Sequence, residues 1–234
     1  MTDIDRRAAL TAVPFAAAAI LQSGDAMAQQ STPAPTYQPV GLPFAPNAIA
    51  GLSERMLVSH HDNNYVGAVR RLGAIQTQLA STDFATAPSF VINGLKREEL
   101  IALNSMILHE IYFASLAGQE RAPNARLGRQ IEEDFGSFER WRAEFIAMGK
   151  ALGGGSGWVL LTWSPRAGRL INTWGADHTM TSANGAVLIA LDMYEHAYAI
   201  DYGAAAAPYV DAFMAALKWD AADRTFAALP RERR

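Results

Sequence analysis

The apolar positions of the N-terminal half of the chain repeat with the period of a helix. A helix start is indicated by Ser53 followed by Glu54, and the apolar residues that continue at helical spacing are Val66, Val69, Leu72, Ile75 and Leu79. The pattern lapses between residues 81 and 94, which we expect to be a loop. It returns in a long segment from residue 96 to residue 118, whose second half is apolar on nearly all sides and therefore buried. Two long helices joined by a loop predict an antiparallel helical hairpin.

After Pro123 the pattern changes from helices to strands. Residues 127–152 are typical of two helices broken at Gly136. Apolar segments at 157–164 and 169–176 flank the turn PRAG and predict a β-hairpin. A third strand is predicted at 187–192 and an amphipathic helix at 208–219. The fold class is therefore α+β, with a long N-terminal antiparallel helical hairpin and a C-terminal domain of helices around a small three-stranded antiparallel sheet.

The N-terminus has the pattern of a signal peptide. Arg6 and Arg7 precede an alanine-rich apolar run that is too short to span a bilayer and that ends in AMA at residues 26–28. The paired arginines indicate the twin-arginine route, so we expect an exported protein, periplasmic or secreted. An N-terminal amphipathic helix is the alternative interpretation.

These features divide the chain into four parts. Residues 1–28 form the signal peptide of twin-arginine type, and residues 29–46 are a proline-rich linker. The helical hairpin domain is expected at 47–121 and the α+β domain at 122–234. Once the signal is removed, we expect no membrane contact.

Charge and cysteine content narrow the possible partners and cofactors. A net charge of -3 and a pI near 5.9 give no basic surface for nucleic acid, so we expect no nucleic-acid partner. The absence of cysteine excludes disulfides, iron–sulfur clusters and thiolate zinc sites, so a metal would need nitrogen and oxygen ligands. The candidate imidazoles are His60, His61, His109, His178 and His196.

An acid and a histidine lie four residues apart in DMYEHAY, residues 192–198. Together with two of the other histidines, Asp192 and His196 could supply three nitrogens and one oxygen to a first-row transition metal. The residues taken singly leave other interpretations open. His109 could be a core histidine with satisfied hydrogen bonds, and Asp192 and His196 could be a pair on a helix surface.

Five motifs, in this order along the chain, resemble the iron/manganese superoxide dismutase family over residues 52–219. They are SHH at 59–61, LHEIYFASL at 108–116, DFGSFERWRAEF at 134–145, GSGWVLL at 155–161 and DMYEHAYAIDY at 192–202. The resemblance implies a metal-dependent dismutation of superoxide to dioxygen and hydrogen peroxide. The last motif is the most specific of the five.

The resemblance also implies a site. Its metal ligands would be His60, His109, Asp192 and His196, holding one iron or manganese ion per subunit. Tyr112 and Trp158 match family positions that line the site. A homodimer through the region of Glu195 and His196 is expected, whereas His178 has no implied ligand role and is expected in a surface loop.

Several residues around the implied ligands depart from the family pattern. Ser105 and Gly154 occupy positions where we expect the family's glutamine, and Asn64 and Ala68 occupy those of a histidine and a tyrosine. In the last motif, Tyr194 stands where the family usually has a tryptophan, and Ala199 stands where it has a second tyrosine.

A compensating network could instead use Asn64, Tyr65, Tyr112 or Tyr194. The alternative function is a non-catalytic or weakly active metal-binding relative that keeps the ligands, and a structural domain without metal is a third possibility.

Overall fold

The computed structural model describes residues 37–118, 122–153 and 155–230. The expected signal peptide, residues 29–36 of the expected linker and Gly154 lie outside the described residues. Within the described part, no helix is both long enough and apolar enough to cross a membrane.

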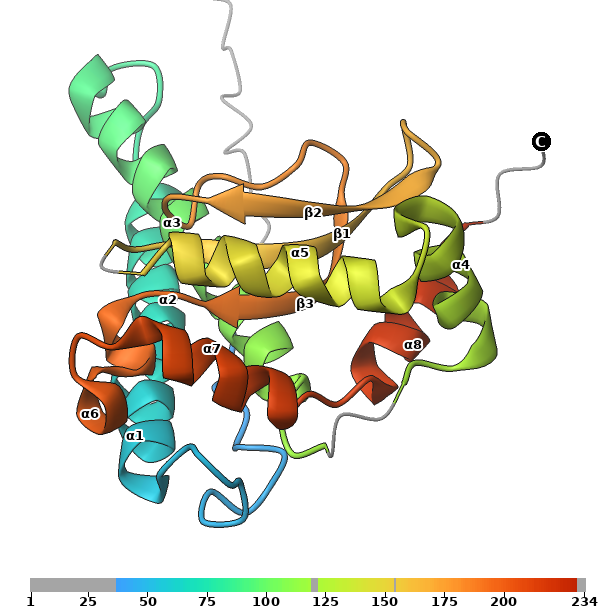
Figure 1. Ribbon diagram of the computed structural model, residues 1–234. Coiled ribbons are helices and arrows are strands. Elements are labelled where there is room, and N and C mark those ends of the chain that lie inside the picture. The colour runs from blue at the N-terminus through green and yellow to red at the C-terminus, as the bar shows by residue number, and fades with distance from the viewer. Residues whose placement is uncertain (1–36, 119–121, 154, 231–234) are drawn as a thin grey trace, which may run out of the picture. The chain divides into compact units, whose positions relative to one another are not determined.

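The N-terminal helical hairpin is present. Its first arm is continuous through the α-helix α1 (Glu54–Ser59), the π-helical turn η1 (His60–Tyr65) and the α-helix α2 (Val66–Ala80), and its second arm is α3 (Ser89–Ala114). The Ser53 hydroxyl caps α1 by accepting a hydrogen bond from the amide of Met56 at 3.1 Å, as the sequence predicts. In Figure 1 the two arms run side by side along one end of the sheet.

The second arm begins earlier than the sequence predicts. Residues 89–94, expected to be loop, form the first turns of α3 directly after Pro88. Gly94 and Pro88 gave this segment the composition of a loop. A proline is compatible with a helix start because the first amide groups of a helix have no intrahelical partner, and one glycine is tolerated once the helix packs.

The C-terminal part has the predicted three-stranded antiparallel sheet, with strand order β2-β1-β3. The strands are β1 (Trp158–Ser164), β2 (Arg169–Gly175) and β3 (Ala186–Asp192). Nearly every residue of the central strand β1 is buried, because helices cover the sheet. In the register, Trp158 lies opposite both Gly175 and Asp192, so the start of β1 meets the end of β3.

Helices surround the sheet on more than one side. The helix α4 (Ala125–Phe135) packs against β2, and α5 (Phe138–Ala151) packs against β1 and lies across the sheet in the foreground of Figure 1. The two are separated at Gly136, whose φ of 90° is readily adopted only by glycine. The break predicted at this residue is confirmed.

The last part of the chain differs from the prediction of one helix at 208–219. After the 3₁₀ turn η2 (Glu195–Ala197) and the short α6 (Ala199–Tyr202), the chain forms α7 (Ala206–Ala215) and then α8 (Asp220–Ala228). Apolar residues continue past the end of α7 because Leu217 and Trp219 are buried in the connection between the two helices. The helical spacing of apolar residues therefore continues over residues 216–219, which are not part of a helix.

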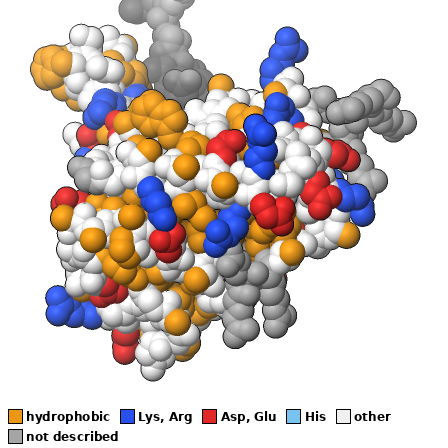
Figure 2. Space-filling model, viewed as in Figure 1, with side chains coloured by type: hydrophobic (Ala, Val, Ile, Leu, Met, Phe, Trp, Pro, Cys, Tyr) orange, Lys and Arg blue, Asp and Glu red, His pale blue; other side chains and the backbone are white. Residues whose placement is uncertain are grey.

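The α+β fold class is confirmed, whereas the proposed domain boundaries stay predictions. α3 packs against β3, so the hairpin and the sheet share one hydrophobic core. Figure 2 shows acidic and basic side chains interspersed with apolar ones on the face that carries α5. The end of β3, the C-terminal part of α3 and the π-helical turn meet inside this core.

Candidate metal centre

His60 enters the core from the π-helical turn. It is the first residue of η1, and its side chain is fully buried. Its Nε2 lies 3.0 Å from Oδ2 of Asp192, while its buried Nδ1 has no hydrogen-bond partner among the described residues. A π-helical turn holds one extra residue, and such turns are frequent at functional sites.

His109 lies on the face of α3 that points to the sheet. Its Nδ1 donates a hydrogen bond to the carbonyl oxygen of Ser105, one turn earlier, at 2.6 Å. In the neutral imidazole this bond fixes the proton on Nδ1 and leaves a lone pair on Nε2. That Nε2 is buried, has no hydrogen-bond partner in the described part of the chain and lies 3.5 Å from Oδ2 of Asp192.

Asp192 ends β3, and His196 lies in the 3₁₀ turn that follows. The interpretation of the two as a pair on a helix surface is wrong, because the chain leaves the strand at Asp192. The amide of Tyr194 donates to Oδ1 of Asp192 at 2.8 Å, which orients the carboxylate. The other oxygen, Oδ2, lies 3.2 Å from Nε2 of His196.

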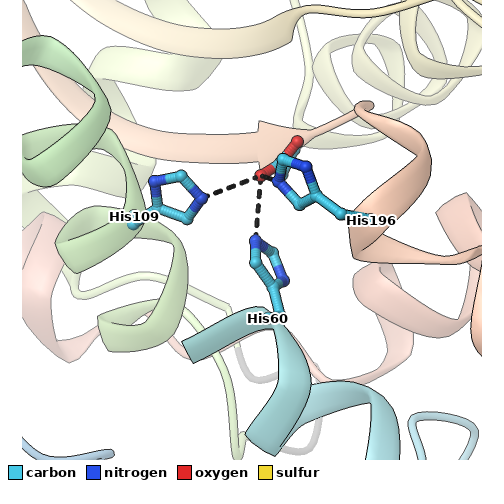
Figure 3. Close-up of side chains that lie close together, drawn as sticks. His60, His109 and His196 are labelled. Carbon is cyan, nitrogen blue, oxygen red and sulfur yellow. Dashed lines mark hydrogen bonds and ion pairs between the residues drawn. The ribbon is translucent and has the colours of Figure 1, made fainter. Parts of the chain in front are cut away.

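The four side chains therefore converge on one point. Each offers one ligand atom, and all four atoms lie within 4.8 Å of one another. Figure 3 shows the rings of His60, His109 and His196 directed from three sides toward the same carboxylate oxygen. A lone pair on Nε2 of His109 facing a carboxylate oxygen is unfavourable without a cation between them, so the donor set fits a metal ion with nitrogen and oxygen preference.

Burial keeps His60 and His109 neutral and ready to coordinate. Burial lowers the pKa of His60, and it lowers the pKa of His109 to about 3. Although burial opposes ionisation of Asp192, its hydrogen bonds with His196 and His60 outweigh that effect and hold its pKa below the usual range. Neutral imidazoles beside one carboxylate are the protonation states that metal binding requires.

The lowered pKa of His109 predicts a pH-dependent stability of the metal-free protein. Between pH 6.5, the ordinary imidazole pKa, and about pH 3, the unfolded chain binds a proton at His109 that the folded chain does not. The free energy of unfolding should therefore fall as the pH falls below 6.5, by about 1.4 kcal/mol per pH unit from this residue. Urea denaturation of metal-free protein at pH 7, 6 and 5 measures the slope. His109→Gln should reduce it, and an unchanged slope in that variant would contradict the assignment.

Two of the aromatic residues expected at the site do line it. The fully buried ring of Tyr112 lies 4.9 Å from the ring of His60, and its hydroxyl oxygen lies 3.3 Å from that of Tyr209. The ring of Trp158 meets the ring of His109 edge-on at 5.3 Å. The strand register explains the position of Trp158, because this residue is paired with Asp192.

His178 is half-buried beside the centre, whereas we expected it in a surface loop. Its Nδ1 accepts a hydrogen bond from Nε1 of Trp158 at 3.0 Å, and its ring stacks on Tyr194 at 4.8 Å. Tyr194 in turn stacks on His196 at 5.3 Å. No sequence pattern indicates this placement, apart from the nearness of His178 to the end of β2.

Asn64 and Tyr65, the other two expected site residues, have different surroundings. Asn64 lines a hollow of 260 Å³ together with His178 and with Ser105, whose carbonyl accepts the hydrogen bond from His109. Tyr65 is buried, but its hydroxyl bonds to Val40 and Glu110, so no described contact links that hydroxyl to the four ligands.

Comparisons with known proteins agree with this geometry. Residues 123–225 match the family model for iron/manganese superoxide dismutases, C-terminal domain. The chain is 60% identical over 196 residues to a protein named superoxide dismutase (Fe) of Cupriavidus metallidurans, covering 84% of this chain and 99% of that protein.

The names of more distant relatives specify either iron or manganese. The superoxide dismutase (Fe) of Aquifex aeolicus is 33% identical over 188 residues, covering 77% of this chain and 87% of that protein. The superoxide dismutase (Mn) of Haloarcula marismortui is 34% identical over 181 residues, covering 73% of this chain and 83% of that protein.

Proposed function

The chain belongs to the iron/manganese superoxide dismutase family, and from this premise we infer that it is an enzyme that dismutates superoxide. Two superoxide ions and two protons give one dioxygen and one hydrogen peroxide. The observation that carries the inference is the convergence of three imidazole nitrogens and one carboxylate oxygen in a chain of this family. The 60% identity over most of the chain to a protein named as this enzyme favours catalysis over a non-catalytic relative.

We assign the metal-ligand role to His60, His109, Asp192 and His196. A bound iron or manganese ion would supply the one-electron chemistry, by alternating between its trivalent and divalent states. Asp192 would contribute the single negative charge of the ligand set, and its orientation is held by the amide of Tyr194. The bond from His109 to the Ser105 carbonyl keeps Nε2 directed at the ion.

The residues around the ligands exclude water and organise hydrogen bonds. Tyr209 donates to the backbone oxygen of Asp192 at 2.8 Å, and its hydroxyl oxygen lies 3.3 Å from that of Tyr112, so two buried hydroxyl groups lie at the end of β3. His178 accepts from Trp158 on Nδ1, which leaves the proton of its neutral ring on Nε2. Burial lowers the pKa of His178, which keeps this tautomer neutral.

We propose iron as the native ion, because the relative that is 60% identical carries iron in its name. Metal analysis of protein from a metal-replete host, combined with a superoxide-consumption assay, tests both the activity and the ion. We expect one ion per chain, mainly iron, and turnover far above that of free aqueous metal. Turnover no faster than the free ion would overturn the enzymatic assignment, and manganese as the only active form would overturn the choice of iron.

We also propose export and a homodimer. The paired residues Arg6 and Arg7 support the twin-arginine route, and replacing both with lysine should leave the protein in the cytoplasm. Unchanged export of that variant would contradict the proposal.

For the dimer, the exposed Glu195 and the partly exposed His196 offer a surface next to the centre. Analytical ultracentrifugation should show a dimer, and Glu195→Ala should weaken it. A monomeric wild-type protein would contradict the proposed dimer.

A further inference from the structure

The chain just before α1 is hydrogen-bonded to the hairpin through the backbone of Val40. Residues 37–44, which we call the arm, pass over the π-helical turn. The amide of Val40 donates to the hydroxyl of Tyr65 at 2.9 Å, and the carbonyl of Val40 accepts from Nε2 of His61 at 2.8 Å. Val40 itself is 62% exposed, so its backbone makes this contact, whereas Leu42 and Phe44 of the arm pack against the hydrophobic core.

The same hydrogen bonds continue to α3, the second helix of the hairpin. The hydroxyl of Tyr65 donates to Oε1 of Glu110 on α3 at 3.0 Å. His61 directly follows the ligand His60, and Glu110 directly follows the ligand His109. One chain of hydrogen bonds, from His61 through Val40 and Tyr65 to Glu110, therefore joins the neighbours of both hairpin ligands.

Packing reinforces this connection. The rings of His61 and Tyr65 lie 5.2 Å apart, and both contact Phe113, at 5.6 and 6.3 Å. Phe113 also meets the ring of His60 at 5.1 Å. A π-helical turn gives up the regular α-helical hydrogen-bond pattern, so contacts from outside the turn are expected to decide how well it keeps its shape.

We propose that the arm is a latch that sets the position of His60 relative to His109 and so slows release of the bound ion. His61 and Tyr65 are positioning residues in this arrangement, because they act on the ion only through the ligands beside them. The inference rests on the proposed metal centre. It assigns a role to the second histidine of the HH pair and to Tyr65, neither of which is used as a ligand.

The test compares metal release with overall stability. Protein loaded with one iron or manganese ion is mixed with excess chelator, and the release rate is followed for wild type, Tyr65→Phe and Tyr202→Phe. The last variant is the matched control, because the Tyr202 hydroxyl also bonds to a backbone carbonyl, that of Gly51, but has no link to a residue that follows a ligand. Tyr65→Phe should release the ion about tenfold faster than wild type, the equivalent of about one to two lost hydrogen bonds, while the control releases at the wild-type rate.

A second pair of variants separates positioning from folding. His61→Gln keeps a donor for the Val40 carbonyl and should release the ion close to the wild-type rate, whereas His61→Ala should release it faster. Hydrogen exchange of metal-free protein should show earlier exchange of the Val40 amide in Tyr65→Phe only.

Failure of the latch and failure of the metal centre give different results. Equal release rates in loaded wild type, Tyr65→Phe and His61→Ala would overturn the latch, as would an equal acceleration in Tyr202→Phe. Failure of the wild type itself to take up one ion would overturn the metal centre instead.

Discussion

Asp192→Asn should abolish metal retention and reduce dismutation to the rate of the free ion. Asparagine keeps the shape of the side chain and can still accept the hydrogen bond from the Tyr194 amide, so the end of β3 should stay intact. What is lost is the single carboxylate of the ligand set, at a site where the other three donors are imidazoles, which carry no charge as metal ligands. Replacing residues that only support metal ligands commonly costs 10- to 100-fold in affinity, and we expect the loss of this ligand to exceed about 100-fold.

The metal-free form of the same variant provides a second signature. In wild type without metal, Oδ2 of Asp192 and the lone pair on Nε2 of His109 face each other at 3.5 Å. The amide nitrogen of asparagine can donate to that lone pair, and the buried charge is removed. Metal-free Asp192→Asn should nevertheless melt below metal-free wild type, because the amide nitrogen cannot accept the hydrogen bonds from His60 and His196 that stabilise the ionised carboxylate.

Metal content after dialysis, activity and melting temperature are the three measurements for this variant. Asp211→Asn is the control, because Asp211 is exposed and pairs with Lys150 on the surface. Stoichiometric metal in Asp192→Asn would contradict the assigned ligand set.

Gly157→Ala should prevent stable folding. Gly157 has a φ of 138°, and a Cβ atom at this position would lie 2.1 Å from the backbone oxygen of Gly175. Because that oxygen belongs to the neighbouring strand β2, it cannot move away without breaking the sheet register at Trp158 and Gly175. The carbonyl of Gly157 also accepts from the amide of Met193 at 2.9 Å, so the distortion would reach the residue after Asp192.

We expect a loss of several kcal/mol in the free energy of unfolding, or insoluble protein. Gly168→Ala is the control, because its φ of 63° is also positive but a Cβ atom there would meet nothing within 4 Å. That variant should lose about 1 kcal/mol, from backbone strain alone. Urea denaturation measures both. A Gly157→Ala protein as stable as Gly168→Ala would contradict the close approach of the two strands.

Much of the fold could be predicted because the decisive signals are local. Ser53 at the start of α1 and Gly136 between α4 and α5 act through their own backbone geometry, so their roles are visible in the sequence. The start of α3 after Pro88 and the separate helix α8 were missed, because tertiary packing there overrides composition.

The site was only partly predictable, because tertiary structure brings its residues together. The positions of His60, His109, Asp192 and His196 followed from a resemblance, since no local pattern brings residues from three distant segments together. His178 reaches Trp158 through the fold of the connection between β2 and β3, and the bonds of Tyr65 depend on the arm. Neither contact involves a spacing that could be recognised along the chain.

The most direct test of the central claim is a crystal structure of the loaded protein with anomalous scattering collected at the iron and manganese edges. The account predicts one anomalous peak per chain, within bonding distance of Nε2 of His60, His109 and His196 and of Oδ2 of Asp192. The absence of a peak there in protein that carries one ion per chain, or a peak held by other residues, would contradict it.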